Sequence, residues 1–148
     1  MPNVAGQTIR AGLMSGEVIA VDTVTSNSST FTTTETTVQS VTASLIDTVV
    51  YDVYAYTHFN ADAVVTEMTA RLREDNSTGT ELWNSYTGAI NFLTTSALGN
   101  WFVLAGSYTA SSTGSKTFVL TGLRTGGAGN CKLVAASNRP SKLLVVRR

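Results

Sequence analysis

Apolar and polar residues alternate along much of this chain with a period of two, which is the pattern of a half-buried β-strand. The clearest run begins at residue 49. Its apolar positions are Val49, Tyr51, Val53, Ala55 and Phe59, and the positions between them include Asp52, Tyr54, Tyr56 and His58. A second run, residues 64–73, alternates in the same way. Because this pattern buries one set of side chains and exposes the other, both runs predict antiparallel strands.

Further strand-like runs follow the same logic along the rest of the chain. They are Glu17–Thr25, Thr30–Leu45 (with a break near Glu35), Thr80–Thr87, Trp101–Ala110, Ser115–Leu123, Cys131–Ser137 and Lys142–Arg147. Clusters of Gly, Asn, Asp and Ser separate these runs, which favours tight turns. The segment Gly88–Gly99 is the least strand-like, and we expect a short helix or a loop there.

About eight or nine strands in one domain predict an all-β fold, an antiparallel β-sandwich with jelly-roll topology. A length of 148 residues suits a single domain with its own hydrophobic core. We expect this domain to span residues 16–148. Residues 1–15 alternate poorly and contain Gly6 and Gly12, so they predict an extended N-terminal arm.

Composition narrows the class of protein further. Ser and Thr account for 39 of the 148 residues, whereas charged residues make up only 14%, against about 25% in an average domain. Scarce Glu, Lys and Gln argue against a helical bundle or a coiled coil. A single Cys and a single His exclude a disulfide scaffold and a His/Cys zinc site. We therefore expect no metal and no cofactor.

The order of the charges is more informative than their sum of zero. Residues 1–81 carry all ten acids and three bases, whereas residues 82–148 carry seven bases and no acid. One interpretation is that strands from the two parts interleave and neutralise each other. The other is that the asymmetry persists in the fold and lets copies of the chain meet with opposite charge.

Candidate catalytic residues are few. Cys131 and His58 are the only thiol and imidazole, and no neighbouring residue is placed to orient them as a nucleophile–base pair. A small buried hydrophobe and a surface residue are the simpler interpretations. No Gly-x-Ser-x-Gly elbow occurs. We expect that the protein is not an enzyme.

Aromatic residues offer a candidate binding site. Tyr54 and Tyr56 share one face of a predicted strand, and together with Trp83 and Trp101 they are candidates for a sugar-stacking platform. The alternative is that the two Trp side chains are anchors of the core or of a subunit interface. Both interpretations remain open at this point.

Several motifs point to a known class of protein. They are Ala70–Glu74 followed by Asn76–Leu82, the pair Trp101–Ala110 and Gly114–Phe118, and the closing run Pro140–Val146. Together they resemble the strand–turn–strand signature, the paired strands and the last strand of small β proteins of tailed bacteriophages, especially phages of actinobacteria. The resemblance covers roughly residues 16–148.

This resemblance implies a structural component of a virus particle. Among such proteins are head decoration, or cement, proteins that sit on the outer capsid, often as trimers. The implied partners are further copies of the chain and the major capsid protein. We expect the contacts to come from the arm and the basic C-terminal strand, with the candidate residues Val4, Ile9, Arg10, Leu13, Arg139, Lys142, Arg147 and Arg148.

An alternative function is a carbohydrate- or receptor-binding module of a phage tail or fibre. It would use the aromatic platform in place of the basic strand. No secretion signal is visible, so we expect synthesis in the host cytoplasm and a final location in the virion. No apolar run approaches the length of a membrane span. The late bases are spaced singly, so we expect neither a membrane nor a nucleic acid as partner.

Overall fold

The structure is a computed structural model that describes residues 16–63, 67–87 and 99–148. All of its regular elements are β-strands. They are β1 (Glu17–Val24), β2 (Thr36–Leu45), β3 (Val50–Ala61), β4 (Glu67–Glu74), β5 (Glu81–Thr87), β6 (Gly99–Thr109), β7 (Gly114–Gly126), β8 (Cys131–Leu133) and β9 (Ser141–Arg147). The predicted arm, residues 1–15, and all but the last residue of the segment 88–99 lie outside the described residues.

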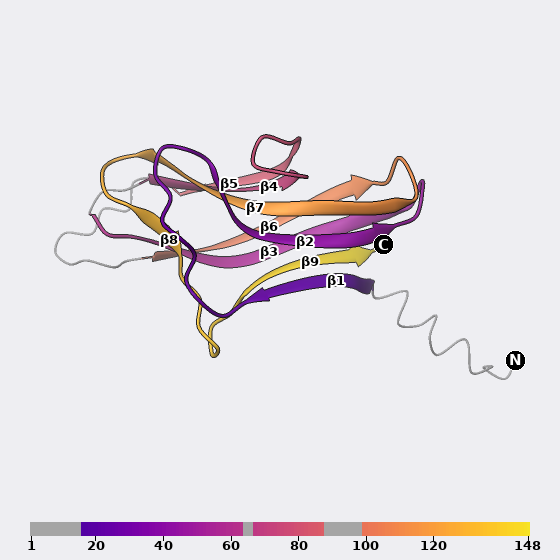
Figure 1. The fold of residues 1–148 in the computed structure, drawn as a ribbon, viewed down its shortest axis with the longest axis horizontal. Coiled ribbons are helices and arrows are strands. Elements are labelled where there is room, and N and C mark those ends of the chain that lie inside the picture. The colour runs from indigo at the N-terminus through magenta and orange to yellow at the C-terminus, as the bar shows by residue number, and fades with distance from the viewer. Residues whose placement is uncertain (1–15, 64–66, 88–98) are drawn as a thin grey trace, which may run out of the picture.

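The strands form two antiparallel sheets that pack face to face (Figure 1). Sheet A has the order β1-β9-β3-β6, with the short β8 also paired to β3, and sheet B has the order β2-β7-β4-β5. The chain crosses between the sheets at every connection except β4–β5 and β8–β9. This winding is that of a jelly roll, so the predicted β-sandwich and its topology are confirmed.

The core lies between the two sheets and follows the alternation in the sequence. Its large, fully buried members include Tyr51, Phe31, Phe59, Phe102, Phe118, Met68, Leu72, Leu104, Leu120, Leu133 and Leu143. The Phe59 and Phe102 rings pack 5.0 Å apart within sheet A, and the Tyr108 and Phe118 rings meet edge to face at 5.3 Å across the two sheets. Each such side chain contributes about 1.5–3 kcal/mol of transfer free energy when it is buried.

One buried polar contact also joins the sheets. The Ser141 hydroxyl on β9 lies 2.6 Å from the Gln39 side-chain oxygen on β2, and the Gln39 amide donates to the Asp22 carbonyl on β1 at 3.0 Å. Gln39 and Ser141 are almost fully buried. Since buried polar groups are costly without partners, these bonds fix how sheet B lies over sheet A at this point.

The connection between β1 and β2 closes one end of the sandwich, on the left in Figure 1. Phe31 exchanges two backbone hydrogen bonds with Cys131, at 2.7 and 2.9 Å, and its ring enters the core against Phe59 at 5.1 Å. The expected break near Glu35 in the run Thr30–Leu45 is present, because β2 begins at Thr36 and the residues before it cover the sandwich end.

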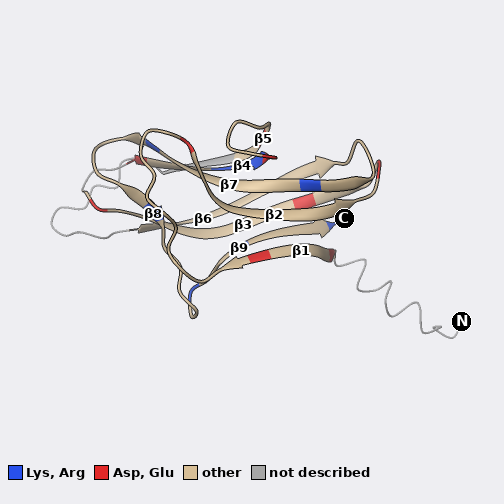
Figure 2. Ribbon diagram, in the orientation of Figure 1, with Lys and Arg blue, Asp and Glu red and all other residues tan. Residues whose placement is uncertain are grey.

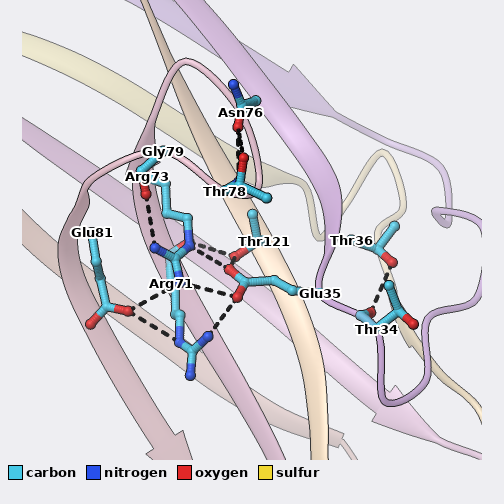
Figure 3. Close-up of polar contacts among 10 residues, drawn as sticks. All are labelled: Thr34, Glu35, Thr36, Arg71, Arg73, Asn76, Thr78, Gly79, Glu81 and Thr121. Atoms are coloured by element: carbon cyan, nitrogen blue, oxygen red, sulfur yellow. Dashed lines mark hydrogen bonds and ion pairs between the residues drawn. The ribbon is translucent and has the colours of Figure 1, made fainter.

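After Phe31, the same connection is tied to the outside of sheet B by a cluster of charges (Figure 3). The Glu35 carboxylate accepts hydrogen bonds from Arg71 at 2.5 Å, from Arg73 at 2.6 Å and from the Thr121 hydroxyl at 2.5 Å. Glu81 lies 3.2–3.3 Å from the same two guanidinium groups. Burial alone would raise the pKa of Glu35, but these donors outweigh it and hold the pKa below its ordinary value.

Gly122 makes room for the Phe31 ring. A Cβ atom at Gly122 would lie 2.6 Å from two carbon atoms of that ring. Non-bonded carbon atoms do not approach this closely, so a larger residue at position 122 would displace the Phe31 ring.

We predict that Gly122→Ala lowers the free energy of unfolding by about 1–3 kcal/mol, because the added methyl group overpacks the site. Phe31→Leu in the same chain should recover part of this loss, since the smaller side chain vacates the contact. Urea unfolding of both single variants, the double variant and the parent protein measures the coupling. Strict additivity of the two changes would contradict the proposed contact.

Candidate functional site

Three of the four predicted platform residues share the outer face of sheet A. Paired residues of antiparallel strands point to the same side, and His58 pairs with Trp101, Tyr56 with Val103 and Tyr54 with Ala105. Tyr54, Tyr56 and Trp101 are all about two-fifths exposed. Trp83 is also exposed, but it lies on β5 in sheet B and does not join them.

Apolar side chains continue across the same face onto β9 and β1. Leu144 pairs with both Tyr54 and Val21, and Val146 pairs with Val18. Val103 is 68% exposed and Val18 and Val21 are each 53% exposed. We call Val18, Val21, Tyr54, Val103, Leu144 and Val146 the outer apolar face.

A hollow of about 430 Å³ lies at the end of this face, where the turn before β9 rises beside the sheet. It is lined by Tyr56, Trp101, Asn138, Arg139, Pro140 and Lys142. The Tyr56 and Trp101 rings are stacked, with centroids 4.7 Å apart and an interplanar angle of 19°. We call this site the cation–aromatic hollow.

His58 supports the hollow from one side. Its ring lies 5.0 Å from that of Trp101, and its side chain is almost completely buried. Burial lowers the pKa of His58 below its ordinary value, and the nearby charge of Arg139 lowers it further, whereas a hydrogen bond with the Gly99 backbone acts in the opposite direction. The imidazole is therefore neutral at pH 7.

Four of the five basic residues predicted for an assembly interface are described by the structure, and they fall into two pairs. Arg147 lies 3.1 Å from Glu17, and Arg148 lies 2.6 Å from Asp52, so both are neutralised within the chain. Arg139 and Lys142 make no ion pair in the part of the chain that the structure describes, and both line the hollow. The other predicted interface residues, Val4, Ile9, Arg10 and Leu13, lie outside the described residues.

Ion pairs between the acidic and the basic part of the sequence support the interpretation that interleaved strands neutralise each other. Lys116 on β7 binds Glu74 and Asp75, at 2.8 Å each, in addition to the two C-terminal arginine pairs. Burial alone would raise the pKa of Asp52, but the Arg148 and Ser107 hydrogen bonds outweigh it and lower that pKa. Charged residues are sparse along the strands of both sheets (Figure 2).

The candidate nucleophile–base pair is separated by sheet A. Cys131 pairs with Ala61 and is completely buried on the inner face, whereas the His58 side chain lies on the outer face beside Trp101. Burial raises the pKa of the Cys131 thiol to about 11, so it is protonated at neutral pH. This geometry does not bring the thiol and the imidazole together.

Within residues 16–63, 67–87 and 99–148, no group of three or more His, Cys, Asp or Glu side chains is placed to hold a metal ion. No helix in these ranges has the length and apolar character that crossing a bilayer requires.

Sequence reasoning did not single out the valines of the outer apolar face, although it named Arg139 and Lys142, which line the hollow, as interface candidates. A signal was present in Leu143-Leu144-Val145-Val146. An uninterrupted apolar run in a strand places apolar side chains on both faces of the sheet. Two of these residues fill the core and the other two extend the outer apolar face.

Comparison with known proteins shows the fold and nothing finer. The sequence matches no protein-family profile and no curated protein. Among solved structures, Eiger TNF from S. frugiperda is similar over 90% of this chain and 88% of that chain, with a TM-score of 0.50 and 13% sequence identity.

Two further similarities are weaker. The capsid protein VP2 of infectious bursal disease virus matches 86% of this chain with a TM-score of 0.37 and 14% identity, and this chain spans only 37% of VP2. A CBM4 structure matches 86% of this chain and 82% of its own, with a TM-score of 0.36 and 10% identity. A viral capsid protein and other β-sandwich proteins are thus among the structural neighbours.

We predict that the stability of the protein rises with pH through the titration of His58. The unfolded imidazole has an ordinary pKa of about 6.5, and the folded one is lower. The unfolded state therefore binds more protons between these two values, so acidification through this window favours unfolding. Urea midpoints at pH 7.5 and 5.5 should differ in the parent protein and converge in His58→Gln. An equal difference in the parent protein and in His58→Gln would show that another group is responsible. Glu35, Asp52 and Asp62 have lowered pKa values, so their titration affects stability at more acidic pH.

Proposed function

We propose that this chain is a non-enzymatic structural protein of a phage particle, a head decoration protein that binds the outer capsid lattice through its outer apolar face. The observation that carries the proposal is the exposure of that face. Of the large apolar side chains that the structure shows to be exposed, only Ile46 and Trp83 lie elsewhere than on the outer side of sheet A. Contiguous apolar surface of this kind is typical of interaction sites.

The surroundings of the face support its use as an interface. Neutralised charges lie at one end, where Glu17 pairs with Arg147 and Asp52 with Arg148, and the unpaired cations of the hollow lie at the other end. An apolar centre with a polar rim is the usual anatomy of a protein–protein interface. Burial of apolar area contributes about 25 cal/mol per Å², so covering this face favours association.

The phage assignment rests on the resemblance of the strand and turn motifs to small β proteins of tailed phages. That resemblance implies a homo-oligomer, the major capsid protein as lattice partner, and a location in the virion. A repeated lattice presents many equivalent sites, and oligomeric binding to it gains avidity without any new contact. A modest single interface is then sufficient for firm attachment.

The copy number in purified particles tests this function. Quantitative mass spectrometry should give a ratio of this chain to the major capsid protein that matches the number of repeated lattice sites. A few copies per particle would contradict head decoration and place the chain on a tail or fibre. Absence from the particle would refute the virion role.

We predict that Val103→Asp reduces binding to heads assembled without the chain by tenfold or more. The substitution places a charge at the most exposed apolar position of the face, where a bound partner would desolvate it. Ile46→Asp is the matched control, because Ile46 is 47% exposed but lies in the turn after β2. Co-sedimentation with heads measures both variants, and circular dichroism checks that both are folded. Equal loss of binding, or no loss in either variant, would contradict the assigned face.

A further inference from the structure

We infer that the cation–aromatic hollow binds an acidic saccharide, meaning a sugar whose pyranose ring carries a carboxylate. The inference goes beyond the proposed decoration function and does not depend on it, since it concerns the hollow beside the outer apolar face and a different kind of ligand. It gives a definite chemistry to the carbohydrate-binding alternative raised by the sequence.

The aromatic pair provides a rigid apolar surface for a sugar ring. Tyr56 and Trp101 stack on each other at 4.7 Å, and Trp101 is further supported by the buried His58 ring at 5.0 Å. The residues Tyr56 and Trp101 are 44% and 43% exposed. The face of an aromatic ring is electronegative, and the C–H groups on one side of a pyranose are weakly electropositive, so the two surfaces attract each other.

The cations next to this surface select a negatively charged ligand. Lys142 pairs in register with Tyr56, and Arg139 lies in the adjoining turn close enough to lower the pKa of His58. Neither cation has an acidic partner among the described residues, and no acidic residue lines the hollow. A carboxylate between them would make charge-assisted hydrogen bonds, which Arg favours by its planar geometry.

The turn that carries Arg139 is fixed before any ligand arrives. Ala136 and Arg139 exchange two backbone hydrogen bonds, of 2.9 and 3.1 Å, and Pro140 follows directly with its restricted backbone. Asn138 adds an amide that can donate to or accept from sugar hydroxyl groups. A preformed site loses less conformational entropy on binding than a mobile one.

Size and charge together favour a saccharide over other anions. The volume of about 430 Å³ lies within the range for small-molecule sites, roughly 300–1,000 Å³. Nucleic acid binding depends on neutralising many phosphates, and only two unpaired cations are present here in a chain of zero net charge. Because Tyr56 and Trp101 stack on each other, they leave no slot between them for a base.

Isothermal titration of the purified chain tests the inference directly. The probes are a tetrasaccharide of alternating glucuronate and N-acetylglucosamine, a galacturonate tetrasaccharide and sialyllactose, each beside its carboxyl-reduced neutral form. We expect at least one acidic probe to bind at least tenfold more tightly than its neutral form, with affinity falling as salt is raised. No binding by any acidic probe, or equal binding of acidic and neutral forms, would overturn the inference.

Variants assign the binding to the hollow. Arg139→Gln and Lys142→Gln should each lower the affinity for the acidic probe about tenfold, as expected when one charged hydrogen bond is lost. The affinity for the neutral form should not change. Lys132→Gln is the matched control, since Lys132 is a single base on β8 that does not line the hollow. Equal effects of all three variants would indicate nonspecific attraction, and tighter binding of oligothymidylate than of any sugar would indicate a nucleic acid site; either result overturns the inference. The particle measurement does not enter this test, so the decoration function and the saccharide site can fail separately.

Discussion

The seating of Phe31 against Gly122 is the contact on which the closed end of this sandwich depends. Two sheets that bury their inner faces leave an open end, and here one aromatic ring from the β1–β2 connection fills it beside Phe59. The backbone of Phe31 pairs with Cys131, so the same residue holds β8 against the connection. From that point the chain runs outward to Glu35, whose carboxylate binds side chains on the outside of sheet B. The strand β2 begins at the next residue.

The two outer faces of the sandwich differ in a way that the core does not require. On sheet B the exposed positions of β2 carry hydroxyl groups, such as Ser40, Thr42 and Ser44, although Trp83 on β5 is also exposed. On sheet A several of the exposed positions carry valine and aromatic side chains, among them Val103, Tyr56 and Trp101. Both proposals therefore place recognition on the outer face of sheet A, which carries most of the exposed large apolar side chains.

The strands were predictable from the sequence because an inner and an outer position alternate at every step of a half-buried strand. The run from Val49 to Phe59 shows this rule, and β3 follows it closely. The grouping of aromatic residues was less predictable. Trp83 and Trp101 look equivalent in sequence, yet one lies in each sheet, and only the pairing of β3 with β6 brings Trp101 beside Tyr56. The hollow depends in addition on the turn before β9, whose position comes from tertiary contacts rather than from a local pattern.

Cys131 has a consequence for how the motion of this molecule can be observed. It is the only cysteine of the chain, it is completely buried under the Phe31 connection, and burial raises its pKa to about 11. A thiol in this state reacts with an alkylating reagent only when its cover lifts, because the reaction needs both access and the thiolate. The rate at which Cys131 is labelled under native conditions therefore measures how often this end of the sandwich opens, without any engineered probe.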